Sequence, residues 1–140
     1  MSKATEVMRQ YLDAVSRQDP DGIRRLFHPK YSYTGGDGQR LEGPEAGVAV
    51  AQTYFAAFPD LTLEVQRMHA VGEDTAVTEF VARGTHRGEL MGIAPTGRRV
   101  EVPVCNVVEV QGGKILAERE YFDTGLLLQQ LGVAAGPVSR

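Results

Sequence analysis

The sequence predicts an α+β domain in which a cone-shaped, strongly curved antiparallel sheet wraps around N-terminal helices. Before Pro59, apolar side chains recur every three or four positions, as on amphipathic helices; after it they alternate, as in strands. The alternation changes phase near Gln66 and Arg67, which indicates a β-bulge, a usual device for curling a sheet. Helices on one face of such a sheet leave a pocket at the open end of the cone.

Four helices are expected. An apolar stripe at helical spacing predicts the first over residues 3–17, and a short second helix ends before Pro29. Pro44 opens a third helix, because a proline costs little in the first turn. The last helix covers residues 124–131, with Asp123 as its N-cap.

The strands follow the third helix, except for a brief one at residues 31–33. Period-two alternation bounded by glycine-rich turns predicts four long antiparallel strands, at residues 61–71, 75–87, 100–110 and 114–122. We therefore expect a single domain over residues 1–132, followed by a C-terminal tail over residues 133–140.

Composition excludes several classes of protein. Of the 140 residues 42% are apolar, and the net charge of −3 argues against a nucleic-acid partner. The single cysteine, Cys105, excludes an intrachain disulfide. No apolar run has the length of a signal peptide or a bilayer span, so we expect a cytoplasmic protein that does not bind membranes.

Residues 84–99, with the sequence GTHRGELMGIAPTGRR, closely resemble the loop signature of the SnoaL-like polyketide cyclases. Other parts of that family match in order at residues 27–31, 58–61, 113–115 and 128–132. The resemblance covers nearly the whole chain. It implies the SnoaL-like or cystatin-like α+β barrel that nuclear transport factor two and ketosteroid isomerase share.

The resemblance also implies a chemistry. Cyclases of this family close a polyketide ring by an intramolecular aldol reaction without metal or cofactor, and a carboxylate on the last strand acts as acid and base. That position falls on Glu120, and two pocket positions on the preceding strand fall on Asn106 and Val104. Here glutamate replaces the family's aspartate, and the side chain of Val104 cannot form a hydrogen bond.

The last hairpin decides which side chains face the pocket. If residues 111–113 form a three-residue loop, Asn106 faces Glu118. Val104 then faces Glu120, in agreement with the family match. A two-residue turn would shift the register by one and bring another set of side chains beside the asparagine: Arg119, Tyr121 and Asp123.

On the first register Glu120 lies in an apolar wall, which should raise its pKa toward neutrality and suit it to proton abstraction next to a carbonyl. Asn106 is either a donor to a substrate oxygen or a core amide. Asp123 is expected to be a helix cap and not a catalyst. An epoxide-hydrolase site, with an arginine between two carboxylates, is not expected, because Arg119 points away from the face of Glu118 and Glu120.

Aromatic side chains near the expected pocket favour an apolar or aromatic ligand. The predicted substrate-binding residues are Tyr11, Tyr33, Tyr54, Phe58, His86, Val104 and Phe122. No metal or cofactor is expected, because the chain lacks a glycine-rich phosphate loop and its three histidines are not at ligand spacing.

Two functions fit these observations. The first is a cofactor-independent cyclase or isomerase that acts on an apolar carbonyl compound such as a polyketide. The alternative is a non-catalytic small-molecule-binding protein of the same fold. A homodimer formed through the outer face of the sheet is compatible with either function. That face has a mixed composition, with Glu101, Cys105, Val107, Glu109, Ala117, Arg119 and Tyr121.

Overall fold

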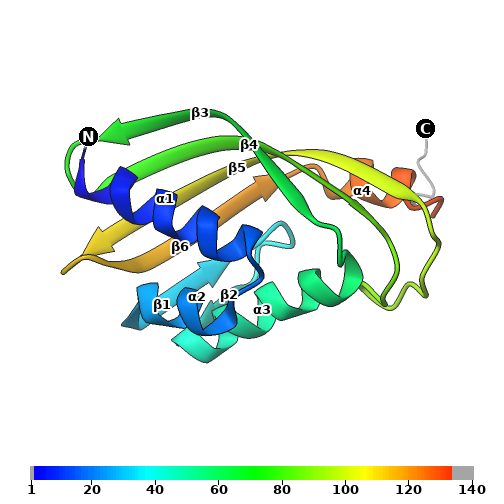
Figure 1. Ribbon diagram of the computed structural model, residues 1–140, viewed down its shortest axis with the longest axis horizontal. Helices are drawn as coiled ribbons and strands as arrows, with labels where there is room; N and C mark the ends of the chain where they lie inside the picture. Colours follow the sequence, from blue (N-terminus) through cyan, green and yellow to red (C-terminus); the bar gives the residue numbers. More distant parts are fainter. Residues whose placement is uncertain (1, 134–140) are drawn as a thin grey trace.

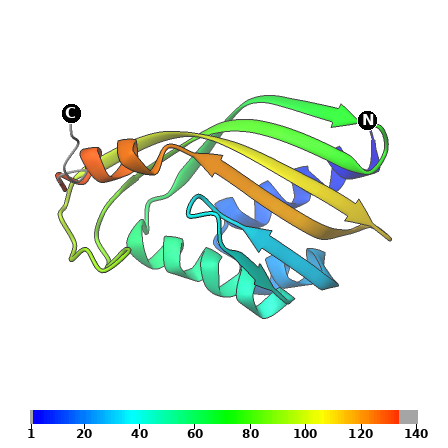
Figure 2. The ribbon, with the colours of Figure 1, turned by 180° about the vertical axis from the view of Figure 1, so that it is seen from behind.

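The computed structural model describes residues 2–133 and confirms the α+β prediction (Figure 1). The elements, in chain order, are α1 Lys3–Ser16, α2 Pro20–Leu26, β1 Phe27–Thr34, β2 Arg40–Glu42, α3 Pro44–Ala57, β3 Thr62–Val71, β4 Thr75–Thr85, β5 Arg99–Gln111, β6 Lys114–Phe122 and α4 Thr124–Gln130. The strands form one curved sheet in the order β2-β1-β6-β5-β4-β3, and α1 and α3 lie on its concave side (Figures 1 and 2). Of the predicted tail, residues 134–140 lie outside the described part.

The sheet is mixed and unclosed, which corrects the expectation of antiparallel strands alone. β1 runs parallel to β6, and the other neighbours pair antiparallel. β1 is longer than predicted, because Phe27 begins the strand instead of ending α2. Its pairing with β6 is interrupted between Phe27 and Ser32, a stretch that contains Pro29, which has no N–H for the ladder.

Local sequence explains the helix positions. Ser2 and Thr5 form a capping box at the start of α1. The buried stripe of α1 includes Met8 and Tyr11, and it packs on the inner face of the sheet. No helix within residues 2–133 is long and apolar enough to cross a membrane.

The predicted bulge in β3 is confirmed, because its pairing with β4 shifts between Val65 and Arg67. A second bulge was not predicted. Glu109 of β5 pairs with Ala117 of β6, but the next residue of β5, Val110, pairs with Ile115. Leu116 is therefore the extra residue of β6.

This second bulge corrects the predicted hairpin register. Gln111 pairs with Lys114 across a two-residue turn, so the expected three-residue loop is wrong. Both turn glycines have positive φ values, 62° and 77°, as a type I′ turn requires. The bulge cancels the change of face that this turn would impose. Asn106 consequently pairs with Glu120, and Val104 pairs with Phe122.

Candidate active site

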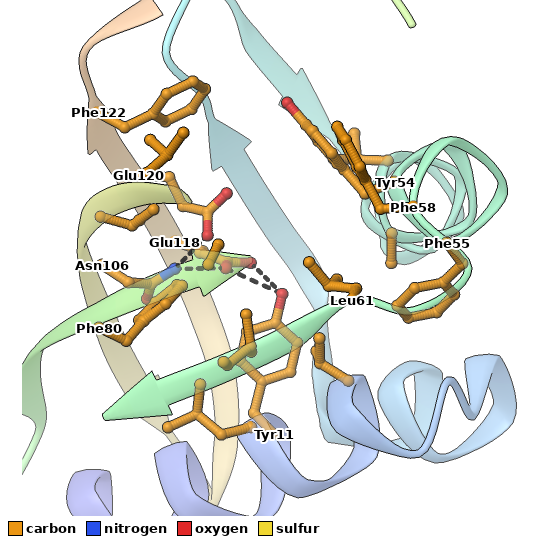
Figure 3. Close-up of a pocket in the computed structure, with 18 of the residues that line it drawn as sticks. Tyr11, Tyr54, Phe55, Phe58, Leu61, Phe80, Asn106, Glu118, Glu120 and Phe122 are labelled. Carbon is orange, nitrogen blue, oxygen red and sulfur yellow. Dashed lines mark hydrogen bonds between the residues drawn. The ribbon is translucent and has the colours of Figure 1, made fainter. Parts of the chain in front are cut away.

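A cavity of about 130 Å³ lies between the concave face of the sheet and helices α1 and α3 (Figure 3). Most of its lining is aliphatic or aromatic. The sheet side carries three polar side chains close together, Asn106, Glu118 and Glu120. Within residues 2–133 no lysine, arginine or histidine lines the cavity.

Glu118 is enclosed by hydrogen-bond donors. Its side chain is 2% exposed. The Tyr31 hydroxyl donates to Oε1 at 2.6 Å, and the Tyr11 hydroxyl lies 2.9 Å from both carboxyl oxygens. The Asn106 amide donates to Oε2 at 2.8 Å. Three donors from three elements thus fix this carboxyl group.

Glu120 also lines the cavity and is half-buried, whereas Glu118 is fully buried. The Tyr33 hydroxyl donates to its Oε1 at 2.9 Å, and the Asn106 amide donates to its Oε2 at 3.0 Å. Glu120 therefore has fewer donors than Glu118 and more access to a ligand.

Asn106 joins the two carboxyl groups, because its Nδ2 atom donates to both. An amide nitrogen carries two hydrogens, so both are engaged. Its Oδ1 atom is buried without a partner in the described structure, as is Oγ1 of Thr78, the residue paired with Asn106 on β4. In this arrangement Asn106 orients the two carboxyl groups. Neither of its amide hydrogens is left to donate to a substrate oxygen.

Burial shifts the pKa values of both carboxyl groups upward. Desolvation, followed by the charge of Glu120, raises the pKa of Glu118 to about 7, although the donors Tyr31, Asn106 and Tyr11 oppose the shift. Desolvation also raises the pKa of Glu120, opposed by the donors Tyr33 and Asn106. Ionisation of one group disfavours ionisation of the other, so the two titrate as a pair.

The tyrosines remain neutral donors at any physiological pH. Burial is the main cause that raises the pKa values of Tyr11, Tyr31 and Tyr33, and the neighbouring carboxylates add to the shift. Burial and the charge of Glu120 raise the pKa of Tyr54 to about 12. Tyr54 lies on α3, across the cavity from Glu120 (Figure 3).

The structure brings most of the predicted site residues to the cavity. Besides Glu120 and Asn106, the lining includes Tyr11, Tyr33, Tyr54, Phe58, Val104 and Phe122. His86 does not line it. The imidazole of His86 is fully buried, and its Nδ1 lies 3.1 Å from the Thr96 amide nitrogen and 3.0 Å from Thr96 Oγ1, so it supports the loop after β4. Asp123 caps α4 by accepting from the Leu126 amide at 3.1 Å, as predicted.

Two residues of the site were not singled out from the sequence, Glu118 and Tyr31. The available signal for Glu118 was its position on the same face as Glu120, two residues along the strand. Tyr31 offered a similar signal, because it lies two residues before Tyr33 on the same short strand. Within the described residues, no group of three His, Cys, Asp or Glu side chains is arranged to hold a metal ion.

Comparison with known proteins decides the family. The sequence profile of the SnoaL-like polyketide cyclases matches residues 5–131. The chain belongs to this family. This SnoaL-like chain is 29% identical to aklanonic acid methyl ester cyclase AcmA of Streptomyces galilaeus, over 94% of this chain and 92% of the relative.

Solved structures agree with this assignment. IdmH of Streptomyces antibioticus is 31% identical, with a TM-score of 0.78 over 92% of this chain and 98% of its own. TsrD of Streptomyces laurentii is 25% identical, with a TM-score of 0.81 over 91% of this chain and 93% of its own. The SnoaL-like fold and the polyketide cyclase family are therefore established for this chain.

Proposed function

We propose that this SnoaL-like protein closes a ring of an apolar carbonyl compound by an intramolecular aldol reaction, with Glu120 as the general base. The observation that carries the proposal is a carboxyl group of raised pKa that faces a mostly apolar cavity. A carboxylate with raised proton affinity is the group that abstraction of a proton next to a carbonyl requires.

The proton balance of the reaction is closed. The Glu120 carboxylate takes a proton from the carbon beside one carbonyl, and the resulting enolate carbon bonds to a second carbonyl carbon of the same molecule. The new alkoxide then takes the proton back from Glu120. Substrate and product are isomers, and the enzyme returns to its starting state.

Tyr54 is the donor we assign to the enolate oxygen. Its hydroxyl has no hydrogen-bond partner within residues 2–133, unlike those of Tyr11, Tyr31 and Tyr33, which are engaged by the carboxyl groups. A hydroxyl that stays protonated and faces the base across the cavity suits the stabilisation of a developing negative charge.

The cavity volume limits what enters. A cavity of about 150 Å³ holds one benzene molecule, so the 130 Å³ found here fits about one ring. We infer that the reacting portion of a larger molecule enters, while the remainder lies at the opening. Aklanonic acid methyl ester, named in the relative AcmA, is the first compound to try.

The test compares the wild type with Glu120→Gln on aklanonic acid methyl ester. We expect the wild type to form a cyclised product of unchanged mass, followed by chromatography and mass spectrometry. The variant should lose turnover by about 10²-fold or more, because general base catalysis contributes about that much. Its ligand affinity, from fluorescence titration, should change only a few-fold because the side chain keeps its size.

Glu89→Gln is the matched control, since it makes the same change at an exposed loop position. It should retain full turnover. If the variant Glu120→Gln turns over as fast as the wild type, the proposed role of Glu120 is wrong. Binding of carbonyl compounds without conversion by the wild type would favour the alternative, a small-molecule-binding protein.

We further propose that the protein is a homodimer formed through the outer face of the sheet. Tyr121 on β6 is 56% exposed there, next to Cys105 and Val107 on β5. An exposed aromatic side chain beside half-buried apolar ones supports a protein–protein contact.

A further inference from the structure

We propose that Glu118 and Glu120 form one proton-binding unit, joined by Asn106, in which Glu118 controls the charge on Glu120. Glu118 would be a positioning residue that acts through Glu120. The pairing itself does not depend on the reaction; its catalytic consequence rests on the proposed function.

The first observation is the shared donor. Asn106 Nδ2 lies 2.8 Å from Oε2 of Glu118 and 3.0 Å from Oε2 of Glu120, so these two oxygens are at most about 6 Å apart (Figure 3). At such a distance one negative charge disfavours a second. The separation is short because the carboxylates are two residues apart on one strand and point to the same face.

The second observation is the lack of a counter-ion. The polar groups that face the pair are Tyr11 from α1, Tyr31 and Tyr33 from β1, Tyr54 from α3 and Asn106 from β5. All five are neutral. Along the described lining of the cavity there is no cation, so a doubly ionised pair would hold two uncompensated charges in a buried site.

The third observation is the difference between the two carboxyl groups. Three donors hold Glu118 in a site where it is 2% exposed, whereas Glu120 has two donors and is half-buried. The fully buried member is fixed, and the half-buried member, Glu120, can exchange a proton with a ligand. The upward shifts of both pKa values agree with this arrangement.

The pair therefore retains one proton up to near-neutral pH. A singly protonated pair contains a carboxylate and a carboxylic acid at the same time. Above the higher midpoint both groups are ionised, and when Glu120 then takes a proton from a carbon acid, the repulsion between the two charges is relieved, which strengthens Glu120 as a base. The proton then returns to the alkoxide, and no co-reactant is consumed.

The test follows the glutamate carboxyl signals by carbon NMR between pH 3 and pH 9, on ligand-free protein. In the wild type we expect two coupled midpoints, the higher one near neutrality. In Glu118→Gln the Glu120 midpoint should fall by at least one pH unit below that higher value. In Glu120→Gln the Glu118 midpoint should fall likewise, since coupling is reciprocal.

Tyr31→Phe tests the same unit in the opposite direction. It removes one donor to Glu118 but keeps the ring that stacks on Phe27 at 3.8 Å. Loss of a donor disfavours the carboxylate, so the higher midpoint should rise. Glu89→Gln, at an exposed position, should leave both midpoints unchanged and controls for loss of a carboxylate elsewhere.

If Glu120 titrates in Glu118→Gln at the same pH as the higher wild-type midpoint, the two groups are independent and the proposal is wrong. Reciprocal shifts with no turnover of any trial substrate would support the pair and contradict the proposed function. Two results together would support both the carboxyl pair and the proposed function. These are reciprocal shifts of the midpoints, and an acid limb of the kcat/KM profile that moves to lower pH in Glu118→Gln.

Discussion

Glu118 combines two opposing influences in one side chain. Its burial disfavours the charged form, but its neighbours Tyr11, Tyr31 and Asn106 all donate hydrogen bonds that favour it. Burial and the charge of Glu120 prevail, so the folded protein binds a proton on this group more tightly than the unfolded chain does.

This difference predicts how stability depends on pH. Because the folded-state pKa of Glu118, about 7, lies above its ordinary value of 4.5, its stabilising contribution is complete below 4.5 and is lost as the pH rises through 7. At about 1.4 kcal/mol per pKa unit, the loss is on the order of 3 kcal/mol. Glu118→Gln cannot ionise, so its free energy of unfolding should fall less between pH 4.5 and pH 7.5.

Urea unfolding followed by circular dichroism at several pH values measures this slope. The informative quantity is the change in the free energy of unfolding with pH. Its absolute value is not, because the glutamine amide also alters hydrogen bonds at every pH. Glu89→Gln should follow the wild type. Parallel curves for the wild type and Glu118→Gln would contradict the expected linkage.

A site residue could be predicted from the sequence only where a family motif or strand alternation pointed to that residue directly. Glu120 and Asn106 were found because the family match and strand alternation agree on them. Glu118 was placed on the correct face, but its importance depends on Tyr11 and Tyr31, which are 107 and 87 residues away along the chain. Contacts at that separation are set by the tertiary fold and leave no local pattern.

At the scale of elements, the bulge in β6 determines which side chains face the cavity. Ile115 is buried and Leu116 is the extra residue, but both are apolar, so alternation cannot tell which one faces in. The parallel pairing of β1 with β6 was equally hidden, because it joins segments separated by most of the chain. By contrast, α1, α3 and α4 were predicted closely, since their signals are local: apolar stripes, the proline that opens α3 and the N-cap of α4.

The packing of α3 on β1 gives a prediction at this scale. Gly47 of α3 lies so close to β1 that a Cβ atom there would meet the Phe27 ring at 2.7 Å and the Tyr31 ring closer still. Gly47→Ala improves helix propensity by about 1 kcal/mol. Overpacking costs about 1–3 kcal/mol, so we expect a net loss of stability in urea unfolding.

Ala49→Gly, at an exposed position of the same helix, is the control that measures the propensity effect alone. Gly47→Ala should also disturb the hydrogen bond from Tyr31 to Glu118 and so shift the titration of the carboxyl pair. An increase in stability equal to the propensity effect would show that α3 can move away from β1 freely.

The whole molecule has two sheet faces with different surroundings. Helices α1 and α3 cover the concave face, while the other face carries charged side chains already paired within the chain. Arg83 contacts Glu64 at 2.6 Å and Glu101 at 2.7 Å, and Arg119 contacts Glu109 at 2.7 Å. Charges that are paired within one chain cost less to cover than free ones, which makes this face suitable for a second copy.

The proposed dimer can be tested by sedimentation equilibrium at micromolar concentration. We expect a mass of about twice the chain mass of 15.2 kDa. Tyr121→Arg places an unpaired cation in the centre of the outer face and should yield the monomer mass, because a buried charge without a partner is strongly disfavoured. Met91→Arg makes a similar change at a loop residue that is 55% exposed and should remain dimeric. A wild-type protein of monomer mass under these conditions would contradict the proposed dimer, whereas the cavity and its carboxyl pair, which are built from one chain, would be unaffected.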